Sequence, residues 1–173
     1  STKTAWIQSD MSGSGLGRSI ICFMVELFRL QLDAGRYVLF EHPAGADTWK
    51  LDFFQDLLDQ PDMMDFVTHM CCFGLSAEDS EGPGLVRKST RLATNSPYMA
   101  RKLQRSCSGD HRHVHLLDGR AAAAAKYTPE FCRAIVSGLR AQRRADFIEA
   151  SKLGEVPQLV QRDPDEYLDL DLC

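Results

Sequence analysis

RYVLFEHPAGADTW, residues 36–49, is the stretch that decides the predicted fold. It holds a short apolar run, YVLF at 37–40, which is too short for a helix and rich in residues typical of strands. The run ends abruptly at Glu41, His42 and Pro43. In open α/β sheets, ligands bind in the crevice outside the carboxyl ends of the strands. We therefore predict a buried strand with Glu41 and His42 as candidate catalytic residues; the alternative for Glu41 is a solvated loop carboxylate.

Two amphipathic helices are predicted on either side of this strand. Residues 18–34 place apolar side chains three and four residues apart, and Gly35 follows as a helix C-cap. Residues 48–59 show a similar pattern and stop before Pro61. Helix, glycine and short strand form half of an α/β unit. We predict a truncated three-layer α/β sandwich of Rossmann type, with strand 37–40 central and both helices packed on the faces of the sheet.

The remaining elements are predicted from the same signals. They are a second strand at 64–70, a strand or hairpin with a basic face at 85–95, a short helix at 96–105, and an arginine-rich helix at 131–145. Thr128-Pro129-Glu130, just before the last of these, is a strong helix start. The predicted organisation is a flexible leader at 1–17, one α/β domain at 18–150 and an acidic tail or linker at 151–173.

Composition places the chain among globular proteins with a single core. It has 173 residues, of which 44% are hydrophobic and 25% charged, and a net charge of -4, which argues against a general nucleic-acid coat protein. The most apolar stretch, 20–32, is interrupted by Glu26 and Arg29 and is shorter than the roughly 20 residues of a bilayer span, so no transmembrane helix is predicted.

Cysteine usage indicates the compartment. Six cysteines without a signal peptide suit an intracellular setting, cytoplasm or nucleus, with free thiols or metal ligation in place of a disulfide framework. Because the sequence starts at Ser1 without a methionine, we expect it to be a segment of something longer.

A metal site is predicted from Cys107, His111 and His113, since zinc takes thiolate and imidazole ligands. Cys71 and Cys72 are the candidates for completing a tetrahedral site, and we assign Cys72 as the fourth ligand. The alternative is that these histidines are surface or core residues hydrogen-bonded to their neighbours.

Basic residues form a further pattern in the same half of the chain. Arg87, Lys88 and Arg91 form a predicted nucleic-acid-binding stripe, which continues in a second group at 101–105. Phosphate contacts require such a stripe, but a solvated face produces the same pattern.

A series of short motifs carries a resemblance to a known family. The motifs are Glu41-His42-Pro43 at a strand end, a helix with Trp49, Cys72-Phe73-Gly74, Val86-Arg87-Lys88-Ser89-Thr90, Thr94-Asn95, Cys107-x3-His111-x-His113 and Tyr127-x-Pro129. In this order they resemble a C5-cytosine DNA methyltransferase-like domain, closest to divergent phage-type versions and to relatives embedded in polyproteins of copia-like retroelements. The likeness spans roughly residues 18–140.

The resemblance implies roles for several residues. Glu41 would hydrogen-bond the ring edge of a flipped cytosine, with His42 in place of the usual Asn, and Arg87 and Lys88 would hold the target backbone. The implied cofactor is S-adenosylmethionine, and the implied partners are DNA and an upstream polyprotein segment.

Two elements of that family lie outside the match. No Pro-Cys pair occurs in the chain, and no glycine-rich cofactor loop follows a first strand. Since C5 transfer needs a thiolate nucleophile, we expect a fragment that does not methylate DNA alone. The alternatives are a non-catalytic nucleic-acid or polyprotein interaction module with a structural zinc, and a redox or zinc protein unrelated to DNA.

Overall fold

The computed structural model describes residues 15–115 and 126–154. Residues 1–14, 116–125 and 155–173 lie outside the described residues, and with them most of the predicted leader and tail. The first and last helices extend slightly beyond the predicted helical ranges. Residues 15–17 belong to the first helix, and residues 151–152 complete the last one.

The centre of the fold is a three-stranded sheet in the order β1-β5-β2. β5 (Ser89–Thr94) lies in the middle and pairs antiparallel with both β1 (Leu39–Pro43) and β2 (Met64–His69). The expected Rossmann-type sheet requires parallel strands, so the prediction holds only at the level of a mixed α/β fold. β1 is an edge strand, not the central one.

The register of β1 explains why the sequence pattern was misleading. Residues 37 and 38 precede the strand, and Val38 is held by side chains at and just beyond the far end of β5: the Val38 N–H donates to Asn95 Oδ1 over 2.9 Å, and Thr94 Oγ1 donates to Val38 O over 2.6 Å. The ladder therefore starts at Leu39 and includes Glu41 and His42. Successive side chains point to opposite faces of a strand, so these two do not meet in a crevice beyond its end.

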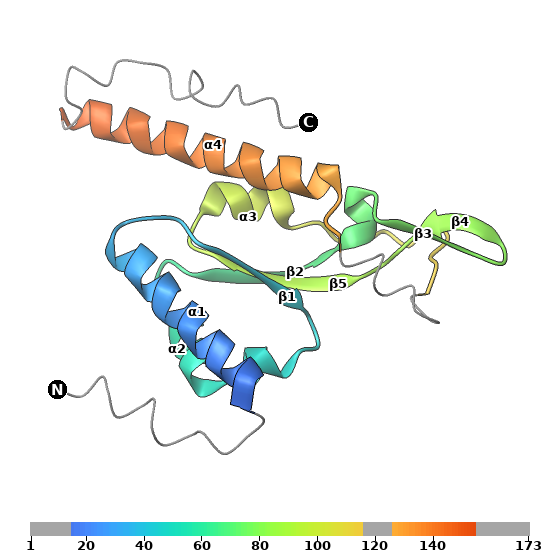
Figure 1. The fold of residues 1–173 in the computed structure, drawn as a ribbon. Helices are drawn as coiled ribbons and strands as arrows, with labels where there is room; N and C mark the ends of the chain where they lie inside the picture. Colours follow the sequence, from blue (N-terminus) through green and yellow to red (C-terminus); the bar gives the residue numbers. More distant parts are fainter. Residues whose placement is uncertain (1–14, 116–125, 155–173) are drawn as a thin grey trace.

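Helices cover both faces of the sheet, which gives three layers (Figure 1). α1 (Gly15–Asp33), the short η1 helix (Asp47–Lys50) and α2 (Asp52–Leu58) lie together on one face. The predicted helix at 18–34 is thus confirmed, whereas the one predicted at 48–59 is divided into η1 and α2 by the extended residue Leu51. All three helices cover the same face. The core between them and the sheet consists of Val25, Phe40, Trp49, Phe54, Leu57 and Ala93.

α3 (Pro97–Leu103) and α4 (Pro129–Lys152) form the opposite layer. Their core includes Phe66, Leu92, Leu103 and Phe131. α4 starts where the sequence predicts, because Pro129 sits at the first helical position and the Phe131 N–H donates to Thr128 Oγ1 over 3.2 Å. The two helices approach closely at Gly138, where a Cβ would lie 2.7 Å from the Met99 Cα.

A smaller unit extends from one end of the sheet. β2 runs into a short helix, η2 (Met70–Phe73), and then into a hairpin formed by β3 (Ser76–Asp79) and β4 (Gly82–Leu85). The segment 104–115, which follows α3, runs back over this unit and pairs with it at Leu85 and His113. None of the helices in the described ranges is long and apolar enough to cross a membrane.

Candidate metal centre

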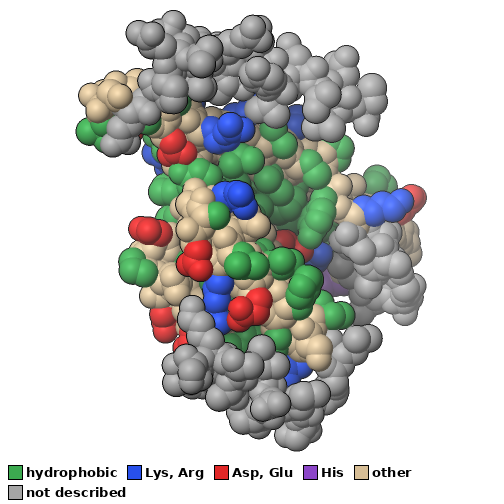
Figure 2. All heavy atoms as spheres, turned by 60° about the vertical axis from the view of Figure 1, so that its left-hand side comes forward, with side chains coloured by type: hydrophobic (Ala, Val, Ile, Leu, Met, Phe, Trp, Pro, Cys, Tyr) green, Lys and Arg blue, Asp and Glu red, His purple; other side chains and the backbone are tan. Residues whose placement is uncertain are grey.

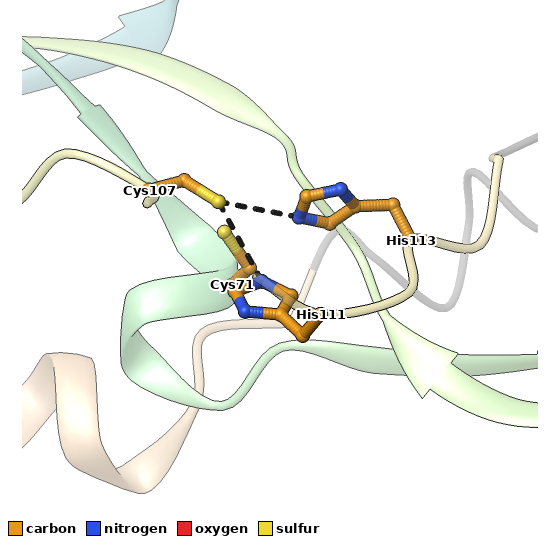
Figure 3. Close-up of side chains that lie close together, drawn as sticks. All are labelled: Cys71, Cys107, His111 and His113. Atoms are coloured by element: carbon orange, nitrogen blue, oxygen red, sulfur yellow. Dashed lines mark hydrogen bonds between the residues drawn. The ribbon is translucent and has the colours of Figure 1, made fainter. Parts of the chain in front are cut away.

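Four potential metal ligands converge where η2 meets the segment that follows α3 (Figure 3). Cys71 is contributed by η2, and Cys107, His111 and His113 by the segment after α3. Their ligand atoms all lie within 4.8 Å of one another. Cys71 is buried and the other three are half-buried.

The spacing of these atoms fits a tetrahedral zinc ion. Cys107 Sγ lies 3.5 Å from His111 Nε2 and 3.4 Å from His113 Nε2. With Zn–S of about 2.3 Å and Zn–N of about 2.0 Å, a sulfur and a nitrogen ligand of a tetrahedral ion lie about 3.5 Å apart. The Cys2His2 cluster could therefore hold a metal such as zinc without rearrangement of these three residues.

A tight turn arranges the first two ligands of the segment. Gly109 has φ +82°, a conformation that favours glycine, and its N–H donates to Cys107 Sγ over 3.3 Å. Ser108 Oγ donates to Asp110 Oδ1 over 2.7 Å, and that oxygen lies 2.9 Å from His111 Nδ1. These two hydrogen bonds lower the pKa of Asp110, that from Ser108 more than that from His111. A charged Asp110 accepts the Nδ1 proton of His111, which leaves Nε2 free to bind a metal.

The scaffold holds the segment in place on both sides of the turn. The Cys107 N–H donates to His69 Nδ1 over 2.9 Å, and the His69 N–H donates to Arg105 O over 3.1 Å. Beyond the cluster, the Val114 N–H donates to Leu85 O over 2.8 Å. The three ligands of the segment are thus positioned by β2 on one side and by the hairpin on the other.

Cys71 and His113 are both held in their neutral forms by their surroundings. Burial is the main cause that raises the pKa of the Cys71 thiol to about 12, with Cys107 and Cys72 adding to it. Partial burial and the neighbouring His111 and Arg87 lower the pKa of His113, which favours the neutral imidazole that binds metals. A metal ion would supply the positive charge that a buried thiolate at Cys71 needs.

The structure groups Cys71, not the predicted Cys72, with the other three ligands. Cys72 is half-buried against the core of the α3–α4 layer, and its carbonyl accepts a hydrogen bond from Arg105 over 3.0 Å. In a helix with about three residues per turn, adjacent side chains point about 120° apart, so only one of the two cysteines can face the cluster.

Glu41 and His42, the predicted catalytic pair, lie on opposite faces of the sheet. Glu41 accepts a hydrogen bond from the Tyr127 phenol, and its Oε1 is buried without a partner among the described residues. His42 stacks on Phe40 with ring centroids 5.7 Å apart and touches the edge of the aromatic cluster at Trp49. Neither residue lies in the metal cluster. Nothing in the sequence around Tyr127 indicates that its side chain contacts Glu41.

The predicted basic stripe is split in the structure. Arg87 and Lys88 lie in the connection between β4 and β5, next to the metal cluster. A cavity of about 350 Å³ there is lined by Val86, Arg87, His113, Val114 and His115. Arg91 lies within β5, where its Nε donates to Asp65 Oδ2 over 2.6 Å and its guanidinium stacks 4.6 Å from the centre of the Trp49 ring. Arg91 is therefore a structural residue on the face of the sheet that α1 and α2 cover.

Comparison of the chain with protein-family models, with curated proteins and with solved structures gave no match.

Proposed function

We propose that this chain is a non-catalytic interaction module built around one structural zinc ion. The observation that supports the proposal is the meeting of four protein ligands, Cys71, Cys107, His111 and His113, within 4.8 Å. Structural zinc sites take four ligands from the protein, whereas catalytic sites keep one position open for water or substrate. A Cys2His2 set leaves no open position on a tetrahedral ion, so the chemistry of the donor set favours a structural role.

The zinc ion would join two parts of the chain that are far apart in sequence. Cys71 follows β2, the other ligands belong to the segment after α3, and this segment pairs with β4 at His113. The segment has no helix or long strand of its own in the described range 104–115. In small sites of this kind, the free energy of metal binding contributes directly to the free energy of folding.

The neighbouring cysteines provide a matched pair of variants for the test. Cys71→Ser removes a ligand, while Cys72→Ser changes the adjacent cysteine, whose side chain packs on the core. We expect protein purified without chelator to contain one zinc per chain by elemental analysis, and Cys72→Ser to retain it. We expect Cys71→Ser to lose the zinc and to melt at a lower temperature.

Cobalt substitution gives an independent readout of the ligand set. Tetrahedral Co²⁺ with thiolate ligands shows a sulfur-to-metal charge-transfer band and intense visible absorption, both of which should be weaker in Cys71→Ser and unchanged in Cys72→Ser. Wild-type protein without stoichiometric metal, or metal loss in Cys72→Ser alone, would contradict the proposal.

The methyltransferase-like function is less well supported by the geometry than the zinc module. Glu41, the residue that would read a cytosine, is engaged by Tyr127, and His42 points to the other face of an antiparallel sheet. No observation supports a site for S-adenosylmethionine. Methyl transfer from S-adenosylmethionine to cytosine-containing DNA, measured beside Glu41→Ala, tests this function directly; we expect no transfer by either protein.

Nucleic acid is the partner that the charge distribution favours for the module. α3 and α4 together carry seven basic and three acidic residues, whereas α1 and α2 carry two basic and four acidic ones. Figure 2 shows this difference: most of the acidic side chains on this face lie over its lower part, where α1 and α2 are, and basic ones gather along α4 above. Basic layers of this kind bind phosphate backbones.

Two arginines of α4 are placed to contact phosphates. Arg133 and Arg144 are exposed, and they lie about three turns apart on one side of the helix, facing away from Phe131 and Ala134 in the core. No carboxylate of the described ranges pairs with either of them. Both therefore present their full charge to the outside.

Salt dependence of nucleic-acid binding tests this partner. We expect weak binding of single- or double-stranded DNA or RNA, with an affinity that falls as salt rises, and a salt slope that decreases by about one for each arginine replaced. Arg133→Ala with Arg144→Ala should weaken binding. Arg29→Ala, which removes an arginine paired with Glu26 on the acidic layer, is the control and should not. Equal loss in both variants would contradict the assignment to α4.

A further inference from the structure

α1 is apolar on two separate sides. On its inner side Val25 is buried, and Ile21, Met24, Phe28 and Leu32 pack against the core that α1 shares with α2. Four more large apolar side chains lie on its outer side with exposed fractions of 49% for Ile20, 63% for Phe23, 40% for Leu27 and 62% for Leu30. Among the described residues, the core therefore uses one of the two apolar sides of α1.

The four exposed residues form a continuous stripe, which we call the outer stripe. They follow one another at intervals of three, four and three residues, which is the a/d spacing of a helix that packs against another helix. A helix on the surface of a monomeric protein carries polar residues on its outer side, and a helix that is apolar on both sides is normally covered. The outer stripe is thus a surface that a second helix would fit.

We propose that two copies of this chain associate through α1, with the outer stripe of one copy packed against the outer stripe of the other. A two-fold axis makes the same patch serve both partners, so the patch must be self-complementary. The spacing satisfies this condition for antiparallel helices. Ile20 of one copy then faces Leu30 of the second, and Phe23 faces Leu27.

The area of the outer stripe indicates which class of interface the two copies can form. The two copies contribute eight side chains that are about half exposed, and at roughly 100 Å² each they bury on the order of 800 Å² before flanking residues are counted. This is below the roughly 1,200 Å² at which standard specific interfaces begin, so the dimer belongs to the weak, transient class. It should form at micromolar or higher concentrations and dissociate on dilution.

The charges next to the outer stripe are compatible with such a contact. Glu26 lies on the same helix and is neutralised by Arg29, whose Nη1 is 3.0 Å from Glu26 Oε1. Two copies can therefore approach without facing unpaired carboxylates from this position. Because α1 and α4 cover opposite faces of the sheet, the dimer also leaves the basic side of both copies accessible.

Sedimentation velocity of the metal-loaded chain over a wide range of micromolar concentrations tests the proposal. We expect wild-type protein to shift from the monomer to the dimer mass as concentration rises. Phe23→Glu with Leu30→Glu should weaken the association at least about tenfold, because each copy then brings two charges into the contact. The matched control is Ile148→Glu on α4 with Leu153→Glu just after it, where the side chains are 47% and 65% exposed. This variant should associate like wild type.

Two further measurements keep the result interpretable. Melting temperatures check that the variants are folded, and the milder Phe23→Ser with Leu30→Ser replaces the glutamate variant if that one unfolds. Wild-type protein that stays monomeric at all concentrations overturns the proposal. Protection of α1 from hydrogen exchange in such a monomer would mean that another part of the same chain covers the outer stripe, and this too counts against the dimer. A dimer that survives both outer-stripe variants also overturns the proposal.

Discussion

The Tyr127 phenol donates a hydrogen bond to the Glu41 carboxylate, across 86 residues of chain. It joins the start of α4 to the edge strand of the sheet. Since Glu41 Oε1 is buried without a partner among the described residues, the bond from Tyr127 is what stabilises this carboxylate on the inside of the α3–α4 layer.

Removing this hydroxyl should therefore destabilise the fold. We expect Tyr127→Phe to lower the free energy of unfolding by about 1–3 kcal/mol, because it leaves a partly buried carboxylate with neither oxygen bonded. Urea unfolding measures the change. Tyr127→Phe in a Glu41→Gln background should cost less, and equal costs in the two backgrounds would show that the two side chains are not coupled.

Alkaline pH should weaken the fold through Tyr37. Burial, followed by the hydrogen bond that Tyr37 donates to Asp146, raises the pKa of Tyr37 from 10.0 to about 12. The folded state thus holds this proton more tightly than the unfolded chain. The stability that it contributes is fully present below pH 10 and is lost as the pH rises from 10 towards 12.

A pair of variants separates Tyr37 from other alkaline effects. Tyr37→Phe should make stability fall less steeply than wild type between pH 10 and 12. Asp146→Asn should have a smaller effect in the same direction, because burial of the phenol remains. Denaturant midpoints measured at several pH values give the slopes, and identical slopes for wild type and Tyr37→Phe would refute the assignment.

The helices were predicted well because their signals, the residues at the helix start and the spacing of apolar side chains, lie within the helix itself. The α4 start at Thr128 and Pro129 and the apolar spacing of α1 need no knowledge of the rest of the chain. Strand direction and order are different. The run 37–40 looked like a central parallel strand, but its partners are decided by the Asn95 and Thr94 contacts from a strand more than fifty residues away.

The sequence predicted three of the four residues of the metal cluster, but not the fourth. Cys107, His111 and His113 are close in sequence, so their spacing alone indicated a metal site. The choice between Cys71 and Cys72 depends on the rotation of a single helical turn, which sequence spacing does not determine. The charge pattern of the sequence suggested that Arg91 contacts phosphate. In the structure, the Arg91 side chain instead contacts Asp65 and Trp49.

The contact between α3 and α4 should be sensitive to a single methyl group. Gly138 leaves no room for a side chain, since a Cβ there would lie 2.7 Å from the Met99 Cα and 3.0 Å from its Cγ. The nearest atom belongs to the backbone, so rotation of a side chain cannot relieve the clash. We expect Gly138→Ala to destabilise the protein by about 1–3 kcal/mol, although alanine favours helices.

The neighbouring residue supplies the control for this prediction. Ser137 is exposed on the same helix, and Ser137→Ala should be neutral or slightly stabilising. Thermal unfolding of both variants measures the difference. A Gly138→Ala variant as stable as Ser137→Ala would mean that α3 and α4 do not pack as closely as the structure shows.

Variants of Arg91 and Arg87 should affect different properties, the first the stability of the fold and the second the binding of nucleic acid. Arg91 pairs with Asp65 and stacks on Trp49, so Arg91→Ala should lower the free energy of unfolding by about 1–2 kcal/mol. It should leave nucleic-acid affinity unchanged at temperatures where the protein is folded.

Arg87 is exposed beside the metal cluster, and no carboxylate in the described ranges pairs with it. Arg87→Ala should therefore leave the unfolding transition in place and lower the salt slope of binding by about one. Urea unfolding and fluorescence anisotropy with labelled DNA measure the two effects on the same preparations. Reduced binding by folded Arg91→Ala, with binding by Arg87→Ala unchanged, would return Arg91 to the nucleic-acid surface and remove Arg87 from it.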